Sequence, residues 1–166
     1  LVNARHILVG FEGGSYDSST GVTTYNEEEK LAAHAKAEDL LAQWLSGDAT
    51  EESFADMANE HSTDTGSNTN GGLYEDIFPG QMVPAFNDWC FDASRKPGDT
   101  GIVETDYGCH IMFYSGDSET NYRDFMIASN LRSHDLEHWY TELVEAATVT
   151  EGNTKYLSND LVLSGN

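Results

Sequence analysis

Two apolar runs at opposite ends of the first 116 residues constrain the fold of this chain more than any other feature. The run ARHILVGF (4–11) is rich in β-branched residues and leads into a Gly/Ser/Thr-rich loop, so it predicts a strand and its exit. GIVET (101–105) and GCHIMFYS (108–115) flank a tight turn at Asp106 and predict a β-hairpin.

The first of these runs (4–11) and the last (108–115) each carry one histidine, His6 and His110. Because side chains alternate between the faces of a strand, His6 shares a face with Ala4, and His110 shares one with Met112, opposite Cys109. If the two strands are neighbours, the imidazoles meet. The alternative is that each is an ordinary buried histidine with a structural hydrogen-bond partner.

Helical signals fill the space between these strands. Asn26 before three glutamates predicts an N-cap with a capping box, and the helix is expected to end near Leu45. Thr50 predicts the start of a second helix and Pro84 the start of a short third one. The expected buried positions are Ala33, Ala37, Leu41, Trp44 and Leu45, then Phe54, Met57, Ala58 and His61, and finally Phe86, Trp89 and Cys90.

The composition narrows the class of protein. The chain has 166 residues and a formal net charge of −21, which disfavours nucleic acid and anionic membrane surfaces as partners. Hydrophobic residues make up 39% of the chain, enough for a core, so the acidity does not indicate disorder. The order of strand, helices, strand, short helix and hairpin predicts an α+β fold rather than a repeated βαβ array.

The chain also resembles the parvulin-type peptidyl-prolyl isomerase domain over roughly residues 1–116. The resemblance implies a four-stranded antiparallel, FKBP-like sheet surrounded by helices. The matching segments, in the order of the family, are HILV (6–9), FADMANEHSTD (54–64), GGL (71–73), GQMVPAF (80–86), FDASRKPGDTGIVET (91–105) and YGCHIM (107–112).

The same resemblance implies the site residues, with no metal and no cofactor. The stretch LYEDIFPG departs from the family pattern by one extra residue and by Tyr74 at a place where glycine is usual, which leaves open whether Ile77 or Phe78 fills the aromatic position. The implied catalytic residues are His6, Asp64, Thr105 and His110, and the implied substrate-binding residues are Leu73, Phe78, Gln81, Met82, Phe86 and Tyr107.

By this resemblance the chain is a non-covalent isomerase of X-Pro bonds in unfolded or nascent polypeptides. Asp64 stands where some relatives have cysteine, which argues against a covalent step. Relatives that require a phosphorylated residue before proline carry basic residues in the loop after the first strand, and residues 12–29 contain neither Lys nor Arg. The alternative function is a non-catalytic polypeptide-binding chaperone module with the same fold.

Three further patterns need an interpretation. Residues 64–75 have the length of a calcium loop but lack its turn glycine, and HDLEH (134–138) fits an inverted zinc-peptidase pattern without a clear third ligand. We interpret both as metal-free. Cys90 and Cys109 sit in apolar runs typical of buried free thiols, with a disulfide between them as the alternative.

Residues 117–166 differ from the rest. A long helix is expected over 119–147, followed by a loose or short-strand tail. The segment resembles the C-terminal return of secreted bacterial foldases and is expected to belong to a chaperone module; a simple packing helix is the alternative. The chain begins at Leu1, so we expect a piece of an extracytoplasmic protein, secreted or anchored through a segment outside it, and a homodimer formed through the tail.

Overall fold

The computed structural model describes residues 1–146, and contacts between residues divide the chain into two compact units, 1–122 and 123–166. The elements, in chain order, are β1 (Val2–Gly10), β2 (Ser15–Asp17), β3 (Val22–Thr24), α1 (Glu27–Ser46), α2 (Glu51–His61), β4 (Leu73–Ile77), α3 (Pro84–Cys90), β5 (Thr100–Thr105), β6 (Gly108–Asp117) and α4 (Tyr122–Ala146).

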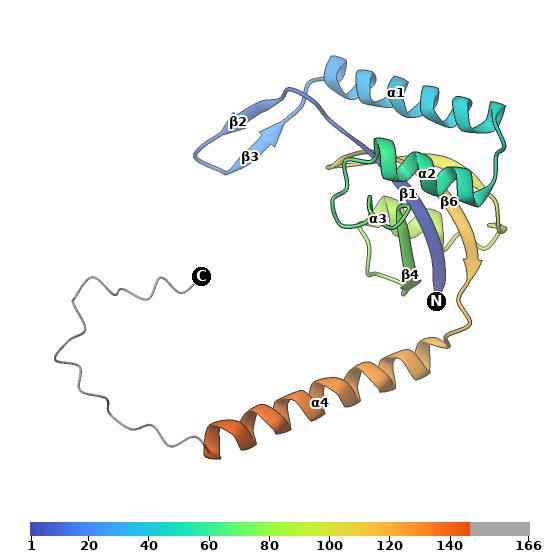
Figure 1. The fold of residues 1–166 in the computed structure, drawn as a ribbon. Helices are drawn as coiled ribbons and strands as arrows, with labels where there is room; N and C mark the ends of the chain where they lie inside the picture. The colour runs from blue at the N-terminus through green and yellow to red at the C-terminus, as the bar shows by residue number, and fades with distance from the viewer. Residues whose placement is uncertain (147–166) are drawn as a thin grey trace. The chain divides into compact units, whose positions relative to one another are not determined.

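The first unit is built on a four-stranded antiparallel sheet with the order β4-β1-β6-β5 (Figure 1). β1 and β6 are therefore the inner strands, and they pair along their whole length from Val2 opposite Asp117 to Gly10 opposite Gly108. The predicted hairpin is confirmed as β5 and β6, and the expected first strand is confirmed with bounds about two residues earlier. The predicted α+β class, with a parvulin-like sheet surrounded by helices, is also confirmed.

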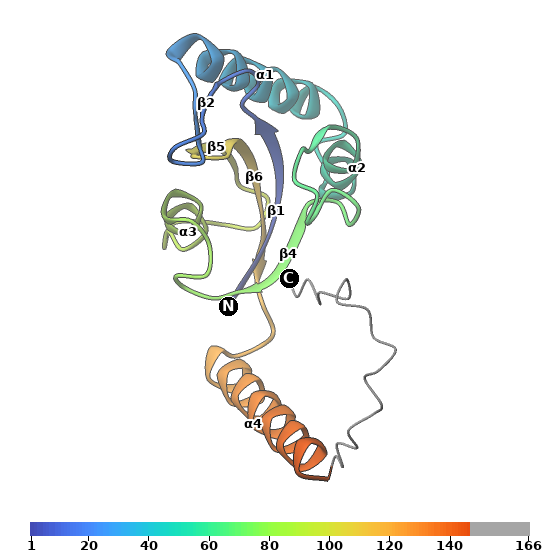
Figure 2. The same ribbon diagram turned by 90° about the vertical axis from the view of Figure 1, so that its left-hand side faces the viewer.

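Both faces of this sheet are covered. Figure 2 shows α1 and α2 on one side and α3 on the other. The expected faces of the central strands are confirmed, because Ala4 and Met112 fall in one cluster while Cys109 and Ile111 fall in the other. The cluster under α1 and α2 contains Ile7, Val9, Ala33, Ala37, Leu40, Trp44, Phe54, Ala58, Cys109, Ile111 and Phe113; that under α3 contains Val2, Ala4, Ile77, Phe86, Cys90, Met112 and Tyr114.

The helix starts follow the capping signals. The Asn26 side chain accepts a hydrogen bond from the Glu29 amide while the Glu29 carboxylate accepts one from the Asn26 amide, which confirms the capping box. The predicted buried face of α1 is partly wrong: Leu40 is buried, whereas Leu41 is only half-buried and Leu45 is 57% exposed. Leu45 lies one residue past the buried Trp44, so it points about 100° away from the core.

The other two helices also match the prediction in outline. Thr50 caps α2, which buries Phe54 and Ala58, and Pro84 opens α3, which buries Phe86 and Cys90. Three side chains expected to be buried are only half-buried, namely Met57, His61 and Trp89. Trp89 carries the Arg95 guanidinium 4.1 Å from its ring centroid, which leaves part of the indole at the surface.

The loop predicted after the first strand contains a small hairpin instead. β2 and β3 pair antiparallel over three residues each, and all six are exposed. A backbone hydrogen bond of 2.8 Å from the Gly21 amide to the Asp17 carbonyl closes the connection. The sequence signal was weak because so short a pair has no buried face and no hydrophobic alternation.

The two cysteines are free and buried in different clusters on opposite faces of the sheet. The sheet separates the two thiols, so the alternative of a disulfide between Cys90 and Cys109 is excluded in this fold.

α4 confirms the expected long helix, with bounds of Tyr122–Ala146. Within the described residues its large apolar side chains are about half exposed, and no helix in 1–146 is long and apolar enough to span a bilayer. The loose or strand-like tail predicted beyond this helix lies outside the described residues.

Candidate active site

A chain of three hydrogen bonds joins the four residues expected to be catalytic. Thr105 Oγ1 lies 2.8 Å from His110 Nε2, and His110 Nδ1 lies 2.9 Å from His6 Nδ1. His6 Nε2 in turn lies 2.8 Å from Asp64 Oδ2. The two imidazoles are stacked with 5.1 Å between ring centroids, so the sheet does bring the two strand histidines together.

The direction of these bonds follows from the chemistry of the end groups. An ionised carboxylate only accepts, so His6 Nε2 donates to Asp64 and the opposite nitrogen of neutral His6 accepts. His110 Nδ1 must then donate to His6, and His110 Nε2 accepts from the Thr105 hydroxyl. All three bonds therefore run in one direction, from Thr105 to Asp64, with both histidines neutral.

The electrostatics agree with neutral imidazoles. Burial lowers the pKa of His6 below its usual value, although Asp64 acts in the opposite direction. Burial and the neighbouring His6 together lower the pKa of His110 to about 4. Protonation of His6 at Nδ1 would place its N–H against the N–H of His110 Nδ1 at 2.9 Å, which is unfavourable.

Asp64 is held from several sides. Its Oδ2 atom accepts from Ser67 Oγ at 2.6 Å and from the Tyr74 hydroxyl at 3.0 Å, and its Oδ1 atom accepts from the Gly66 amide at 3.1 Å. Partial burial acts to raise the pKa of Asp64, but the hydrogen bonds from Ser67, Gly66 and His6 outweigh it and lower the pKa to about 2. The carboxylate is therefore ionised and firmly oriented.

A glycine fixes the backbone next to His6. The His6 amide donates to the Gly72 carbonyl at 2.9 Å, where the chain enters β4. Gly72 has φ +69°, and a Cβ atom there would lie 2.1 Å from the His6 carbonyl oxygen. The GGL segment thus lets β4 approach β1 at the histidine.

An apolar pocket of about 280 Å³ opens beside the hydrogen-bonded chain. Phe86 presents its ring edgewise to both imidazoles, with centroids 5.4 Å from His6 and 5.6 Å from His110. The residues that line the pocket are His6, Leu8, Asp64, Tyr74, Gln81, Met82, Val83, Phe86, Tyr107 and His110.

The pocket includes most of the predicted substrate-binding residues but not two of them. Gln81, Met82, Phe86 and Tyr107 line it, whereas Leu73 and Phe78 do not. Leu73 pairs with Arg5 and so lies on the sheet face away from His6, because neighbouring residues of a strand face opposite ways.

The register of β4 explains this correction. Tyr74 pairs with Ala4 and Ile77 with Val2, so two residues of β4 stand opposite one residue of β1, which is a β-bulge. Asp76 takes the positive φ of 54° within it. The bulge brings Ile77 into the core with no exposed surface, and leaves Phe78 half-buried beyond the end of the strand.

Sequence reasoning missed four residues of the site. Leu8 and Val83 line the pocket, Ser67 holds Asp64, and Tyr74 does both. The signal for Leu8 was present, since it alternates with His6 along β1. Tyr74 required knowledge of the register between β4 and β1, and Ser67 lies in a loop where no periodicity applies.

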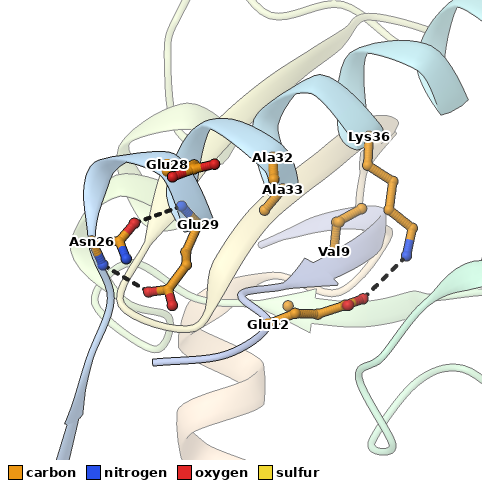
Figure 3. Close-up of a pocket in the computed structure, with 9 residues that line it drawn as sticks. Val9, Glu12, Asn26, Glu28, Glu29, Ala32, Ala33 and Lys36 are labelled. Atoms are coloured by element: carbon orange, nitrogen blue, oxygen red, sulfur yellow. Dashed lines mark hydrogen bonds and ion pairs between the residues drawn. The ribbon is translucent and has the colours of Figure 1, made fainter. Parts of the chain in front are cut away.

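A larger pocket of about 420 Å³ lies at the N-terminal end of α1 and contains none of the predicted site residues. Figure 3 shows its acidic character: Glu29 is engaged in the helix cap, and an ion pair of 3.6 Å joins Glu12 to Lys36 at the other end. Two of its acidic side chains, Glu12 and Glu29, are thus already engaged, and the hydrogen bonds from Gly14 and Asn26 lower the pKa of Glu29.

The residues of the two sequence patterns that resemble metal sites, 64–75 and 134–138, make other contacts. Asp64, the first position of the calcium-like loop, is part of the histidine chain. His134 and His138 stack on α4 at 6.4 Å between centroids, and His138 pairs with Glu142 at 3.7 Å. Within residues 1–146, no three His, Cys, Asp or Glu side chains are grouped to hold a metal ion.

Comparisons with known proteins identify the family of this chain. The family description PPIC-type PPIASE domain matches residues 1–116. Foldase protein PrsA 1 of Listeria innocua is 43% identical over 61 residues, covering 37% of this chain and 21% of that protein. Foldase protein PrsA of Caldanaerobacter subterraneus subsp. tengcongensis is 30% identical over 156 residues, covering 90% of this chain and 42% of that protein.

The fold has solved counterparts. The crystal structure of the PPIase domain of TBPAR42 superposes with a TM-score of 0.53 and 21% sequence identity, covering 69% of this chain and 98% of that one. The chain spans less than half the length of the curated foldases given above. The comparisons do not favour the alternative of a non-catalytic binding module, and the resemblance noted from the sequence is confirmed: the chain belongs to the PPIC-type peptidyl-prolyl cis/trans isomerase family, with residues 1–116 as its isomerase domain.

Proposed function

We propose that this domain rotates unphosphorylated X-Pro bonds by a non-covalent mechanism. The supporting observation is the apolar pocket beside a chain of neutral histidines. Rotation about the bond faces a barrier of about 18–20 kcal/mol because amide resonance is lost, and the twisted amide is less polar than the planar one. A pocket walled by Phe86 and Met82 would remove water from the bond and favour the twisted state by differential binding.

The state of the side chains near the pocket argues against a covalent step. The Asp64 carboxylate accepts four hydrogen bonds and has a pKa of about 2, so it is a poor nucleophile. Burial raises the pKa of the Cys90 thiol to about 12, and Cys109 faces the other side of the sheet. In this proposal His6 and His110 orient Asp64 and Thr105 rather than exchange protons with substrate.

The surroundings favour substrates without phosphate. A space of about 600 Å³ next to the turn at Asp106 is lined by that residue, Glu104 and the aromatic rings of Phe11 and Tyr25. Lys30 also lines this space, and its amino group lies 3.9 Å from the Glu104 carboxylate, which already neutralises its positive charge. A phosphate of charge near −2 would meet carboxylates here, and neutral or basic residues before proline are expected to be preferred.

A peptide series tests both parts of the proposal. Cis/trans exchange is measured by NMR on peptides that differ only before proline, with Ala, Arg, Glu or phosphoserine. We expect turnover with Ala and Arg, slower turnover with Glu and the slowest with phosphoserine. Turnover on the phosphorylated peptide alone would refute the assignment of substrate. Peptide binding without any acceleration of exchange would instead indicate the non-catalytic module.

We further propose that the whole protein is an extracytoplasmic foldase that acts on unfolded polypeptides. The support is that the relative matched over 90% of this chain is named a foldase and one matched over 73% of it is named a chaperone. In this proposal residues 117–166 belong to a chaperone module that accompanies the isomerase domain of 1–116. Refolding of a proline-limited protein, with and without the chain, tests the foldase activity; cell fractionation tests the location.

We also propose that the chain associates as a homodimer through α4. Its exposed apolar residues include Leu136, Trp139 and Leu143, with more than half of each residue's surface accessible. A net charge of −21 opposes association, so the dimer should strengthen with salt. Sedimentation of the full chain at low and high salt tests this against a variant with Leu136→Gln and Leu143→Gln. A monomer in both salts would contradict the proposal.

A further inference from the structure

We propose that Tyr74 is a positioning residue of the isomerase site, one that joins the wall of the proline pocket to the hydrogen-bonded chain ending at Asp64. This inference rests on the proposed function, because it assigns a part in that same site. It concerns a side chain that stands where the family resemblance implies glycine, and whose pairing with Ala4 places it on the sheet face of His6.

The contacts of Tyr74 fall into two groups. Its ring lines the pocket, lies 5.4 Å from the His6 ring and stands edgewise to Phe86 at 6.5 Å between centroids. Its hydroxyl donates to Asp64 Oδ2 at 3.0 Å. The polar end of the side chain is thus bonded to the carboxylate, and the apolar ring is the part left to contact substrate.

The hydroxyl has a defined role because of the crowding at Asp64. The same Oδ2 atom accepts from His6 and from Ser67 Oγ, so Tyr74 provides the third donor to a single oxygen. Burial and the nearby carboxylate raise the pKa of Tyr74 above its usual value, which keeps the phenol protonated as a donor. The carboxylate that orients His6 is therefore itself oriented by the pocket wall.

Two consequences separate this role from simple packing. A proline ring that packs on Phe86 and Tyr74 restrains the same phenol that holds Asp64, so occupancy of the pocket should sharpen the orientation of the histidine chain. Removal of the hydroxyl alone should leave the pocket wall intact but loosen Asp64. Loss of the aromatic wall should therefore raise KM, whereas loss of the hydroxyl should lower kcat and change the titration of Asp64.

The test compares Tyr74→Phe with Tyr74→Leu in the full chain. Tyr74→Phe should leave KM for an Ala-Pro peptide within about twofold and lower kcat about fivefold, the effect of one hydrogen bond. Tyr74→Leu should lower kcat similarly and also raise KM, because the aromatic wall is lost. Tyr114→Phe is the matched control, since the Tyr114 hydroxyl also donates to an aspartate, Asp117, at 2.9 Å but lies outside the pocket lining.

A second readout does not depend on turnover. Carboxyl titration by NMR should show the pKa of Asp64 higher by about one unit in Tyr74→Phe, because one of its donors is gone, and unchanged in Tyr114→Phe. An unchanged kcat together with an unchanged Asp64 titration would overturn the inference. If the wild-type chain has no isomerase activity, the proposed function fails, and the titration alone then decides whether Tyr74 positions Asp64.

Discussion

Acid should destabilise this fold through His110 in a way that can be calculated. The side chain is buried, and its pKa falls from 6.5 to about 4 because burial and His6 disfavour the charged ring. Between these two values the unfolded chain binds a proton that the folded chain does not. Stability therefore rises with pH across this window, and it is lost as the pH falls from about 6.5 toward 4.

The size of the effect follows from the two pKa values. The fall of the His110 pKa from 6.5 to about 4 corresponds to about 3 kcal/mol, of which about 2 kcal/mol is lost between pH 7 and about pH 4.5. Protonation of surface carboxylates acts in the opposite direction by relieving repulsion in a chain of net charge −21. The contribution of His110 must therefore be measured as a difference between two proteins.

Urea unfolding followed by tryptophan fluorescence at a series of pH values provides that difference. His110→Asn removes the titrating ring, so the free energy of unfolding of this variant should fall by about 2 kcal/mol less than that of the wild type over the same window. His134→Asn serves as the control, because the His134 side chain is 76% exposed and lies on α4, outside the histidine chain. Parallel pH profiles for wild type and His110→Asn would refute a neutral, buried His110.

Three further pairs of substitutions test the active site and the backbone next to it. Gly72→Ala should cost several times more stability than Gly98→Ala, which costs about 1 kcal/mol for its positive φ alone; equal losses in thermal unfolding would rule out the close approach to β1. Thr105→Val should lower kcat about fivefold and Thr105→Ser should restore it, as measured by exchange NMR; no difference between them would exclude a role for the hydroxyl. Met82→Ala should lower kcat/KM about tenfold, whereas Cys109→Ser on the other face should change it less than twofold; similar losses would remove the pocket assignment.

The sequence was informative wherever one local rule decided the outcome. Strand alternation placed His6 and His110 on the correct faces, and the capping boxes at Asn26 and Thr50 located two helix starts. These features depend on residues close together in the chain. The pairing of the two histidines then needed only one long-range fact, that β1 and β6 are neighbours.

The rest depended on tertiary register. The register of β4 against β1 places Tyr74 rather than Leu73 on the pocket face, and the bulge at Asp76 brings Ile77 into the core. No alternation pattern reveals this register or an extra residue before the partner strand is known. Leu40 rather than Leu45 is buried in α1 because of the direction from which the helix packs on the sheet. Ser67 reached Asp64 through a loop, where sequence spacing does not determine distance.

Because the site lies on the inner strands of the sheet, its local structure should be lost only when the whole domain unfolds. β1 and β6 are paired on both edges and covered on both faces, so the amides of His6 and Ile111 should exchange with solvent only when the whole domain unfolds. The β2–β3 hairpin, exposed throughout, should exchange by local opening. A destabilising substitution far from the pocket would then reduce the fraction of folded molecules without changing the structure of the site in the molecules that stay folded. Activity per folded molecule should stay constant up to the unfolding transition and vanish together with the protected amides.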